Sequence, residues 1–155
     1  TFSKVLTIIP AYNESQNIQK VLDELKQDFP ETDILVVNDS STDNTKDIVL
    51  ANNINCITTV FNLTYAYAIQ TGIKYAKKYN YDYCLMFDGD GQHIAKEAKK
   101  LLSTIKEKNC DIVIGSRYIE KGNYNPLKIR KLGCSIFTFL IKIIIVIVIF
   151  LEIIK

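Results

Sequence analysis

Short runs of β-branched and other apolar residues alternate along this chain with longer segments whose apolar residues recur every three or four positions. The short runs predict buried strands at residues 4–9, 33–37, 56–61, 83–87 and 111–115. The longer segments predict helices at about residues 14–28, 44–52, 66–78 and 95–108. Strands that alternate with helices of this length favour βαβ units. We therefore predict an α/β domain with a mostly parallel sheet.

The first predicted helix carries the clearest start signal. Asn13 is a suitable N-cap residue, and Gln16 stands three positions later, as in a capping box. The helix then places apolar residues along one stripe at Ile18, Val21, Leu22 and Leu25. We expect this stripe to pack against the sheet.

A short polar cluster follows four of the predicted strands. The clusters are Pro-Ala-Tyr-Asn-Glu at 10–14, Asn-Asp-Ser-Ser-Thr-Asp at 38–43, Asp-Gly-Asp-Gly-Gln-His at 88–93 and Gly-Ser-Arg-Tyr at 115–118. The carboxyl ends of parallel strands meet at one edge of the sheet, where open α/β sheets bind ligands. We therefore expect all four clusters to contribute to one site.

Asp88 and Asp90, separated only by Gly89, are the strongest candidates for metal ligands. Mg²⁺ and Mn²⁺ prefer oxygen ligands and commonly bridge one or two carboxylates to substrate phosphates. Glycines at 89 and 91 allow a tight turn and the close approach of a ligand. A solvated acidic turn would account for the same residues, so both interpretations stay open here.

Other phosphate and metal motifs do not match. An EF-hand loop starting at Asp88 requires glycine and glutamate where His93 and Lys99 stand. The chain has neither a GxxxxGK[ST] phosphate loop nor the GxGxxG fingerprint of dinucleotide-binding domains. Dinucleotide binding is therefore disfavoured.

Composition narrows the class of protein. A length of 155 residues with 48% hydrophobic content is enough for one domain with a core. A net charge of +2 gives no sign of a nucleic-acid-binding surface. Four cysteines without a CxxC pair argue against a zinc site or a disulfide framework, and three of them are expected to be small buried residues. No signal peptide is visible at the N-terminus, so a reducing, cytoplasmic compartment is expected.

The end of the chain differs in composition from the rest. We expect one domain over residues 1–125 and a basic, then apolar, segment over 126–155, in which almost every residue of 136–154 is apolar. Its uncharged run, 143–151, is about half as long as a membrane-spanning helix requires. An apolar C-terminal helix on a membrane surface or on the sheet is favoured over a spanning helix, and a truncated segment is the third possibility.

Taken in order, the four clusters resemble the motifs of the family 2 glycosyltransferases with the GT-A fold. They are most similar to the dolichyl-phosphate-mannose-synthase-like branch, which makes polyprenyl-phosphate sugars. The resemblance covers about residues 4–142, because Arg-Lys-Leu-Gly at 130–133 is similar to the start of the family's next helix. It implies a Rossmann-like three-layer α/β/α sandwich whose residues 1–125 bind a nucleotide-sugar.

The resemblance also implies roles for particular residues. The nucleotide pocket would be lined by Pro10, Ala11, Tyr12, Glu14, Val37 and Asp39. Asp88 and Asp90 of the Asp-x-Asp motif, together with Gln92, would hold Mg²⁺ or Mn²⁺, and Gly89 would lie close to the donor. Asp90 and Arg117 are the implied catalytic residues, since a cation and an arginine stabilise the negative charge on a departing nucleotide.

Simpler roles remain open for several of these residues. Tyr12 could be a surface aromatic residue, Asp39 a turn or cap residue, and Arg117 a loop cation. His93, the only histidine, is a candidate general base, although its place just past the metal ligands favours a supporting role at the helix entry.

The chain departs from the family pattern at three places. After Asn62 the family has a glycine-rich stretch, whereas this chain has Thr64, Tyr65, Ala66 and Tyr67, which would crowd a phosphate. Asn38 stands where an acidic residue is common. After residue 142 the family continues into an Asp-x-Thr-Ser-Gly-Phe-Arg-like segment on the acceptor side, where this chain has the apolar residues 143–154.

We therefore predict a metal-dependent inverting glycosyltransferase that moves a sugar from a UDP- or GDP-sugar to an acceptor, with polyprenyl phosphate as the candidate. Such an enzyme would work at the cytoplasmic face of a membrane, which residues 136–154 would contact. A truncated, non-catalytic remnant that binds nucleotide or membrane is the alternative. A nucleotidyltransferase on a related fold is a third, but the glycine-rich N-terminal loop of those enzymes is absent.

Overall fold

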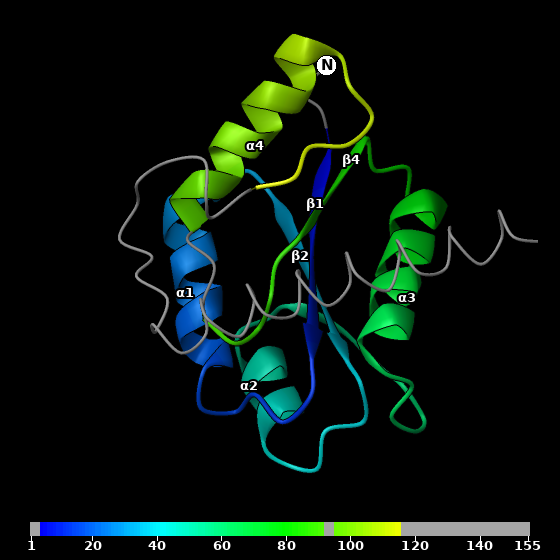
Figure 1. Cartoon of the computed structure of the whole chain (residues 1–155). Helices are drawn as coiled ribbons and strands as arrows, with labels where there is room; N and C mark the ends of the chain where they lie inside the picture. The colour runs from blue at the N-terminus through cyan, green and yellow to red at the C-terminus, as the bar shows by residue number, and fades with distance from the viewer. Residues whose placement is uncertain (1–3, 92–94, 116–155) are drawn as a thin grey trace, which may run out of the picture. The chain divides into compact units, whose positions relative to one another are not determined.

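A computed structural model describes residues 4–91 and 95–115 of the chain. The chain divides into two units, residues 1–114 and 115–155, and all described helices and strands belong to the first. In order along the chain, they are β1 (Val5–Ala11), α1 (Ile18–Asp28), β2 (Asp33–Asn38), α2 (Thr45–Ala51), β3 (Asn55–Thr58), α3 (Tyr65–Lys78), β4 (Tyr83–Met86) and α4 (Ala95–Lys108). The predicted alternation of strands and helices is therefore confirmed through α4 (Figure 1).

The four described strands form one parallel sheet in the order β3-β2-β1-β4. Strand β1 lies between β2 and β4, so that Leu6 is paired with Asp33 on one side and with Cys84 on the other. All seven residues of β1 are buried, as expected for a central strand covered on both faces. The predicted parallel sheet is confirmed.

Helices cover both faces of this sheet, and side chains of β1 alternate between the two layers. Val5 and Ile9 point into a core formed with α1, α2 and α4, and this core buries the whole predicted stripe of α1. Leu6 and Ile8 point into a second core formed with α3. Figure 1 shows α1 and α4 on one side of the strands and α3 on the other. The described residues therefore form the predicted α/β/α sandwich.

The predicted fifth strand, residues 111–115, is wrong. This segment forms no strand, and both Ile112 and Ile114 are exposed. An apolar run becomes a strand only when a neighbour accepts its backbone hydrogen bonds, and within the described sheet β4 pairs with β1 alone. The third strand is also shorter than the predicted 56–61, since it spans only Asn55–Thr58.

The prediction of buried cysteines is wrong for Cys84 and Cys110, which are exposed, while Cys56 is partly buried. Cys84 lies on the α3 side of the edge strand β4, where no described element covers it. The expected apolar C-terminal helix and the boundary at residue 125 lie outside the described residues. None of the described helices is long and apolar enough to cross a membrane.

Hydrogen bonds join the loop after β1 to the loop after β2. Backbone amides of the first loop donate to side chains of the second: Glu14 N to Thr45 Oγ1 at 2.9 Å, and Ser15 N to Asp43 Oδ2 at 3.0 Å. In the opposite direction, Thr42 N donates to Asn13 Oδ1 at 2.8 Å. These bonds hold two of the predicted polar clusters side by side at the carboxyl edge of the sheet.

This arrangement overturns the prediction that Asn13 and Gln16 form a capping box for α1. The helix begins at Ile18 with Asn17 as its N-cap residue. Asn13 has φ 56°, in the left-handed region, and its carboxamide oxygen accepts hydrogen bonds from Thr42 instead. The local capping signal was outweighed by a partner 29 residues away.

We expect Asp43→Asn to lower the free energy of unfolding by about 1 kcal/mol at neutral pH, because it weakens the link between the two loops. Burial of the carboxyl group opposes its ionisation, but the hydrogen bonds donated by Thr45 and Ser15 outweigh that effect and hold its pKa well below the ordinary 3.8. A lowered pKa stabilises the folded state above pH 3.8, and the contribution is lost as the pH falls below that value.

Urea unfolding from about pH 7 to about pH 3 measures this contribution. The stability difference between wild type and Asp43→Asn should shrink as the pH falls. Asp111→Asn, at an exposed aspartate outside the helices and strands, is the control. A difference as large at about pH 3 as at about pH 7 would contradict the assignment.

Helix α3 packs closely on β1 at Gly72, where an added Cβ would lie 2.3 Å from Ile8 Cγ2. Although alanine favours helix more than glycine does, we expect Gly72→Ala to destabilise the fold by about 2 kcal/mol through overpacking. A double-mutant cycle measured by urea unfolding tests this contact. Ile8→Ala removes the obstructing methyl group, so Gly72→Ala should cost much less in that background. An equal cost in both backgrounds would show that this contact is not the cause.

Candidate functional site

A cleft of about 460 Å³ lies at the carboxyl edge of the sheet. Eight of the predicted site residues line it: Pro10, Ala11, Tyr12, Glu14, Asp39, Asp88, Gly89 and Asp90. Pro10 and Ala11 are the last residues of β1, and the other six come from the loops that follow β1, β2 and β4. Three of the four predicted clusters therefore meet in one cleft, as parallel strand ends require.

The first and third clusters touch at Gly89. A Cβ added to this glycine would lie 3.3 Å from the Pro10 carbonyl oxygen and 3.6 Å from Glu14 Cγ. Just before it, the Phe87 amide donates to the Ile8 carbonyl at 3.0 Å and continues the pairing of β4 with β1. The small residue between the two aspartates thus lets the acidic turn lie directly against the end of β1.

Asp39 is buried at the base of the cleft and holds a neighbouring loop in place. Its Oδ1 accepts hydrogen bonds from Thr59 Oγ1 and from the Leu63 amide, both at 2.9 Å. These contacts tie the segment between β3 and α3 to the end of β2. The turn role that the sequence left open for Asp39 is therefore real, and it coexists with a place in the cleft wall.

The two acidic residues after β4 give the cleft a negative character. Tyr65, the first residue of α3, donates its hydroxyl hydrogen to Asp88 Oδ1 at 2.9 Å. Burial, this hydrogen bond and the negative charges of Asp88 and Asp90 raise the pKa of Tyr65 to about 12. Two neighbouring carboxylates attract a cation to this part of the cleft.

The carboxylates of Asp88 and Asp90 suit a hard divalent cation such as Mg²⁺ or Mn²⁺. Within residues 4–91 and 95–115, however, no group of three or more histidine, cysteine, aspartate or glutamate side chains could hold a metal ion. Two carboxylates fill only part of the coordination shell of such a cation. Asp88 and Asp90 therefore fit a cation whose remaining ligands are oxygens of substrate phosphates and water.

Val37, which was predicted to line the nucleotide pocket, does not line this cleft. Side chains alternate along β2, and this alternation places Val37 fully in the core against α3. The residue is not part of the cleft wall. Gln92, His93 and Arg117 lie outside the described residues, and only Gly115 of the fourth cluster is described.

Four cleft residues were not predicted as site residues: Asn62, Thr64, Tyr65 and Ala68. All lie between β3 and the first turns of α3, at the same sheet edge as the predicted clusters. Their position after a strand was the available signal. Thr64 and Tyr65 stood out in the sequence only as departures from the family's glycine-rich stretch, because the segment has no polar cluster with recognisable chemistry.

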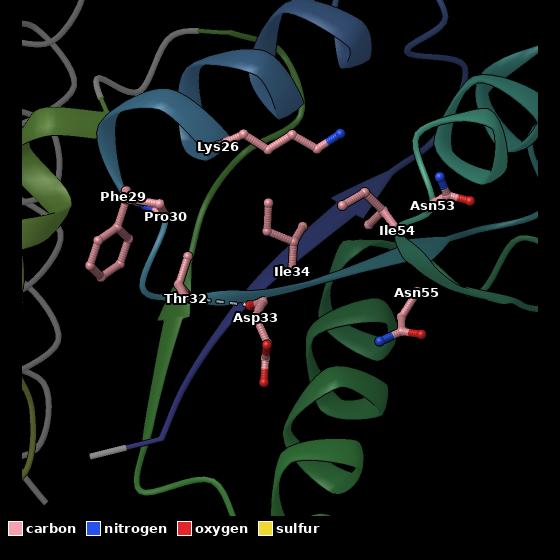
Figure 2. A pocket seen from close by; sticks show the side chains of 9 residues that line it. All are labelled: Lys26, Phe29, Pro30, Thr32, Asp33, Ile34, Asn53, Ile54 and Asn55. Atoms are coloured by element: carbon pink, nitrogen blue, oxygen red, sulfur yellow. Dashed lines mark hydrogen bonds between the residues drawn. The ribbon is translucent and has the colours of Figure 1, made fainter. Parts of the chain in front are cut away.

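A second, smaller hollow of about 280 Å³ lies at the opposite end of the sheet, where β2 begins at Asp33. Figure 2 shows Lys26 above this hollow, with Ile34 and Ile54 beneath it. The ammonium group of Lys26 donates to the backbone and side-chain oxygens of Asn52, at 3.2 and 3.0 Å. None of the predicted site residues lines this hollow, so the carboxyl-edge cleft is the candidate site.

Known proteins are similar to this chain in sequence and in fold. Undecaprenyl-phosphate mannosyltransferase of Micrococcus luteus is 34% identical over 126 residues, which cover 77% of this chain and 50% of the relative. UDP-N-acetylglucosamine–dolichyl-phosphate N-acetylglucosaminyltransferase of Methanococcus voltae is 32% identical over 158 residues, covering 88% of this chain and 62% of the relative. The chain therefore spans about half to three-fifths of the length of these curated relatives.

A solved mannosyltransferase from Pyrobaculum calidifontis, in complex with GDP-Man and Mn²⁺, has a similar fold. The TM-score is 0.57 at 22% identity, and the match covers 74% of this chain and 35% of that protein. The predicted GT-A fold is thereby confirmed. The model of the family described as "Glycosyl transferase family 2" matches residues 7–150. This match covers nearly the whole chain, and the chain therefore belongs to glycosyl transferase family 2.

Proposed function

We propose that the carboxyl-edge cleft binds a nucleoside-diphosphate sugar together with Mg²⁺ or Mn²⁺, and that the protein transfers the sugar with inversion to polyprenyl phosphate. One observation carries this proposal. Asp88 and Asp90, which could hold a cation, share a single cleft with Tyr12 and Asp39 in a chain of glycosyl transferase family 2.

The cleft offers separate surfaces for the parts of such a donor. Tyr12 is an exposed aromatic ring on which a base could stack, and Asp39 forms the wall beside it. Asp88 and Asp90 would bind the cation, and Gly89, between them, would lie close to the donor. When bound, the cation would neutralise the charge that develops on the departing nucleoside diphosphate. We further propose that Gln92 binds the same cation and that Arg117 stabilises the negative charge of the departing nucleotide.

A phosphate acceptor would need no general base from the cleft. The ionised oxygen of a polyprenyl phosphate can attack the anomeric carbon directly, while the bond from that carbon to the diphosphate oxygen breaks. A single displacement of this kind inverts the configuration and needs no proton acceptor. The relatives that act on undecaprenyl and dolichyl phosphates support this acceptor class. Residues 126–155 would then bring the chain to the cytoplasmic face of a membrane.

Nucleotide binding without transfer is the second candidate function. The segment after Asn62 favours it, because Thr64 and Tyr67 stand where the family has glycines and Tyr65, between them, donates a hydrogen bond to Asp88. Incubation with UDP- and GDP-sugars, Mn²⁺ and polyprenyl phosphate separates the two functions. Formation of polyprenyl-phosphate sugar supports transfer, whereas a donor that binds without being consumed supports the second function.

Isothermal titration with UDP and GDP, in the presence and absence of Mn²⁺, tests the binding step. We expect Mn²⁺ to strengthen the binding of one nucleotide, and Asp88→Asn or Asp90→Asn to weaken it by at least about ten-fold. Asp82→Asn is the matched control, because it removes the same charge at the amino end of the same strand. Binding that neither Mn²⁺ nor the Asp88 and Asp90 substitutions alter would contradict the proposal.

A further inference from the structure

We propose that Tyr65 is a latch on the cation site: in the cation-free protein its hydroxyl group holds Asp88, and a divalent cation must displace that group to bind. This inference rests on the function proposed above for the same cleft, and it assigns a role to a residue that the family pattern does not supply. Tyr65 would thereby determine how tightly the site binds a cation.

The contact itself links two elements that are distant in sequence. Tyr65 Oη lies 2.9 Å from Asp88 Oδ1, across 23 residues of chain, and the ring forms part of the cleft wall. A lone pair that accepts the phenol hydrogen is not available to a metal ion. Because the ring lies beside the carboxylate, it also takes space that the water or phosphate ligands of a bound cation would need.

The backbone before Tyr65 directs the side chain into the cleft. Thr64 has φ 78° and ψ 162°, a conformation that is normally restricted to glycine and is costly for a β-branched residue. The Thr64 amide donates to Asn62 Oδ1 at 3.1 Å, and its carbonyl accepts from the amides of Tyr67 and Ala68 at 3.2 Å. These bonds hold the turn in its strained form and start α3 at Tyr65.

The latch can open without disturbing the core. Tyr65 is 57% exposed and belongs to neither hydrophobic core, whereas α3 is anchored by buried residues further along, among them Ala68 and Ile69. Rotation of one side chain would therefore remove this hydrogen bond from Asp88, while the buried residues keep the helix anchored on the sheet.

Mn²⁺ binding measured by the electron paramagnetic resonance signal of the free ion, without nucleotide, tests the latch. Tyr65→Phe keeps the ring and removes the hydroxyl group, so it should bind Mn²⁺ about five-fold more tightly than wild type. Tyr67→Phe is the matched control, since Tyr67 is 55% exposed, lies two residues further on and does not line the cleft. It should bind as wild type does. Circular dichroism shows that each variant is folded.

The outcomes separate the latch from the proposed function. Equal or weaker Mn²⁺ binding by Tyr65→Phe overturns the latch, and so does a failure of that variant to bind at all. If Tyr65→Phe still tightens Mn²⁺ binding in a protein that also carries Asp88→Asn, the latch is overturned as well, because it acts through Asp88. Tighter Mn²⁺ binding by Tyr65→Phe in a protein that binds neither UDP nor GDP would leave the latch standing while the proposed function fails.

Discussion

The parallel pairing of β1 with β2 on one side and β4 on the other is the constraint on which the cleft depends. It brings the ends of three strands to one edge, so that residues more than seventy positions apart become neighbours. The contacts of Gly89 with Pro10 and Glu14 show how closely two of these ends meet. Hydrogen bonds between the loops after β1 and β2 then fix the third end beside them.

The negative charge of the cleft lies beside a bulky side chain that contacts it. Asp88 and Asp90 concentrate negative charge where a glycine keeps the backbone close to β1. Tyr65 closes one side of this acidic turn through a single hydrogen bond. Thr64, directly before that tyrosine, has a strained backbone conformation. Thr64 and Tyr67 stand where the family pattern has glycines, and Asp88 is engaged by Tyr65 within the protein itself.

Local patterns were sufficient to predict most of the fold. Helix α4 has the predicted bounds, and every residue of the stripe on α1 is buried. Eight of the predicted site residues line the cleft because they end or follow parallel strands. The failures have non-local causes. Asn13 is engaged by Thr42, the apolar run at 112–114 has no described strand to pair with, and Tyr65 reaches Asp88 across the cleft. Short windows of sequence contain none of these partners.

Paramagnetic broadening by Mn²⁺ in amide NMR spectra tests most directly the claim that the strand ends form one cation-binding cleft. Substoichiometric Mn²⁺ should broaden the signals of Asp88, Gly89 and Asp90 together with those of Tyr12 and Tyr65. Signals of Asp82 and Asn55, at the amino ends of β4 and β3, should stay sharp. Broadening centred on those amino ends, or spread evenly over the protein, would contradict the account.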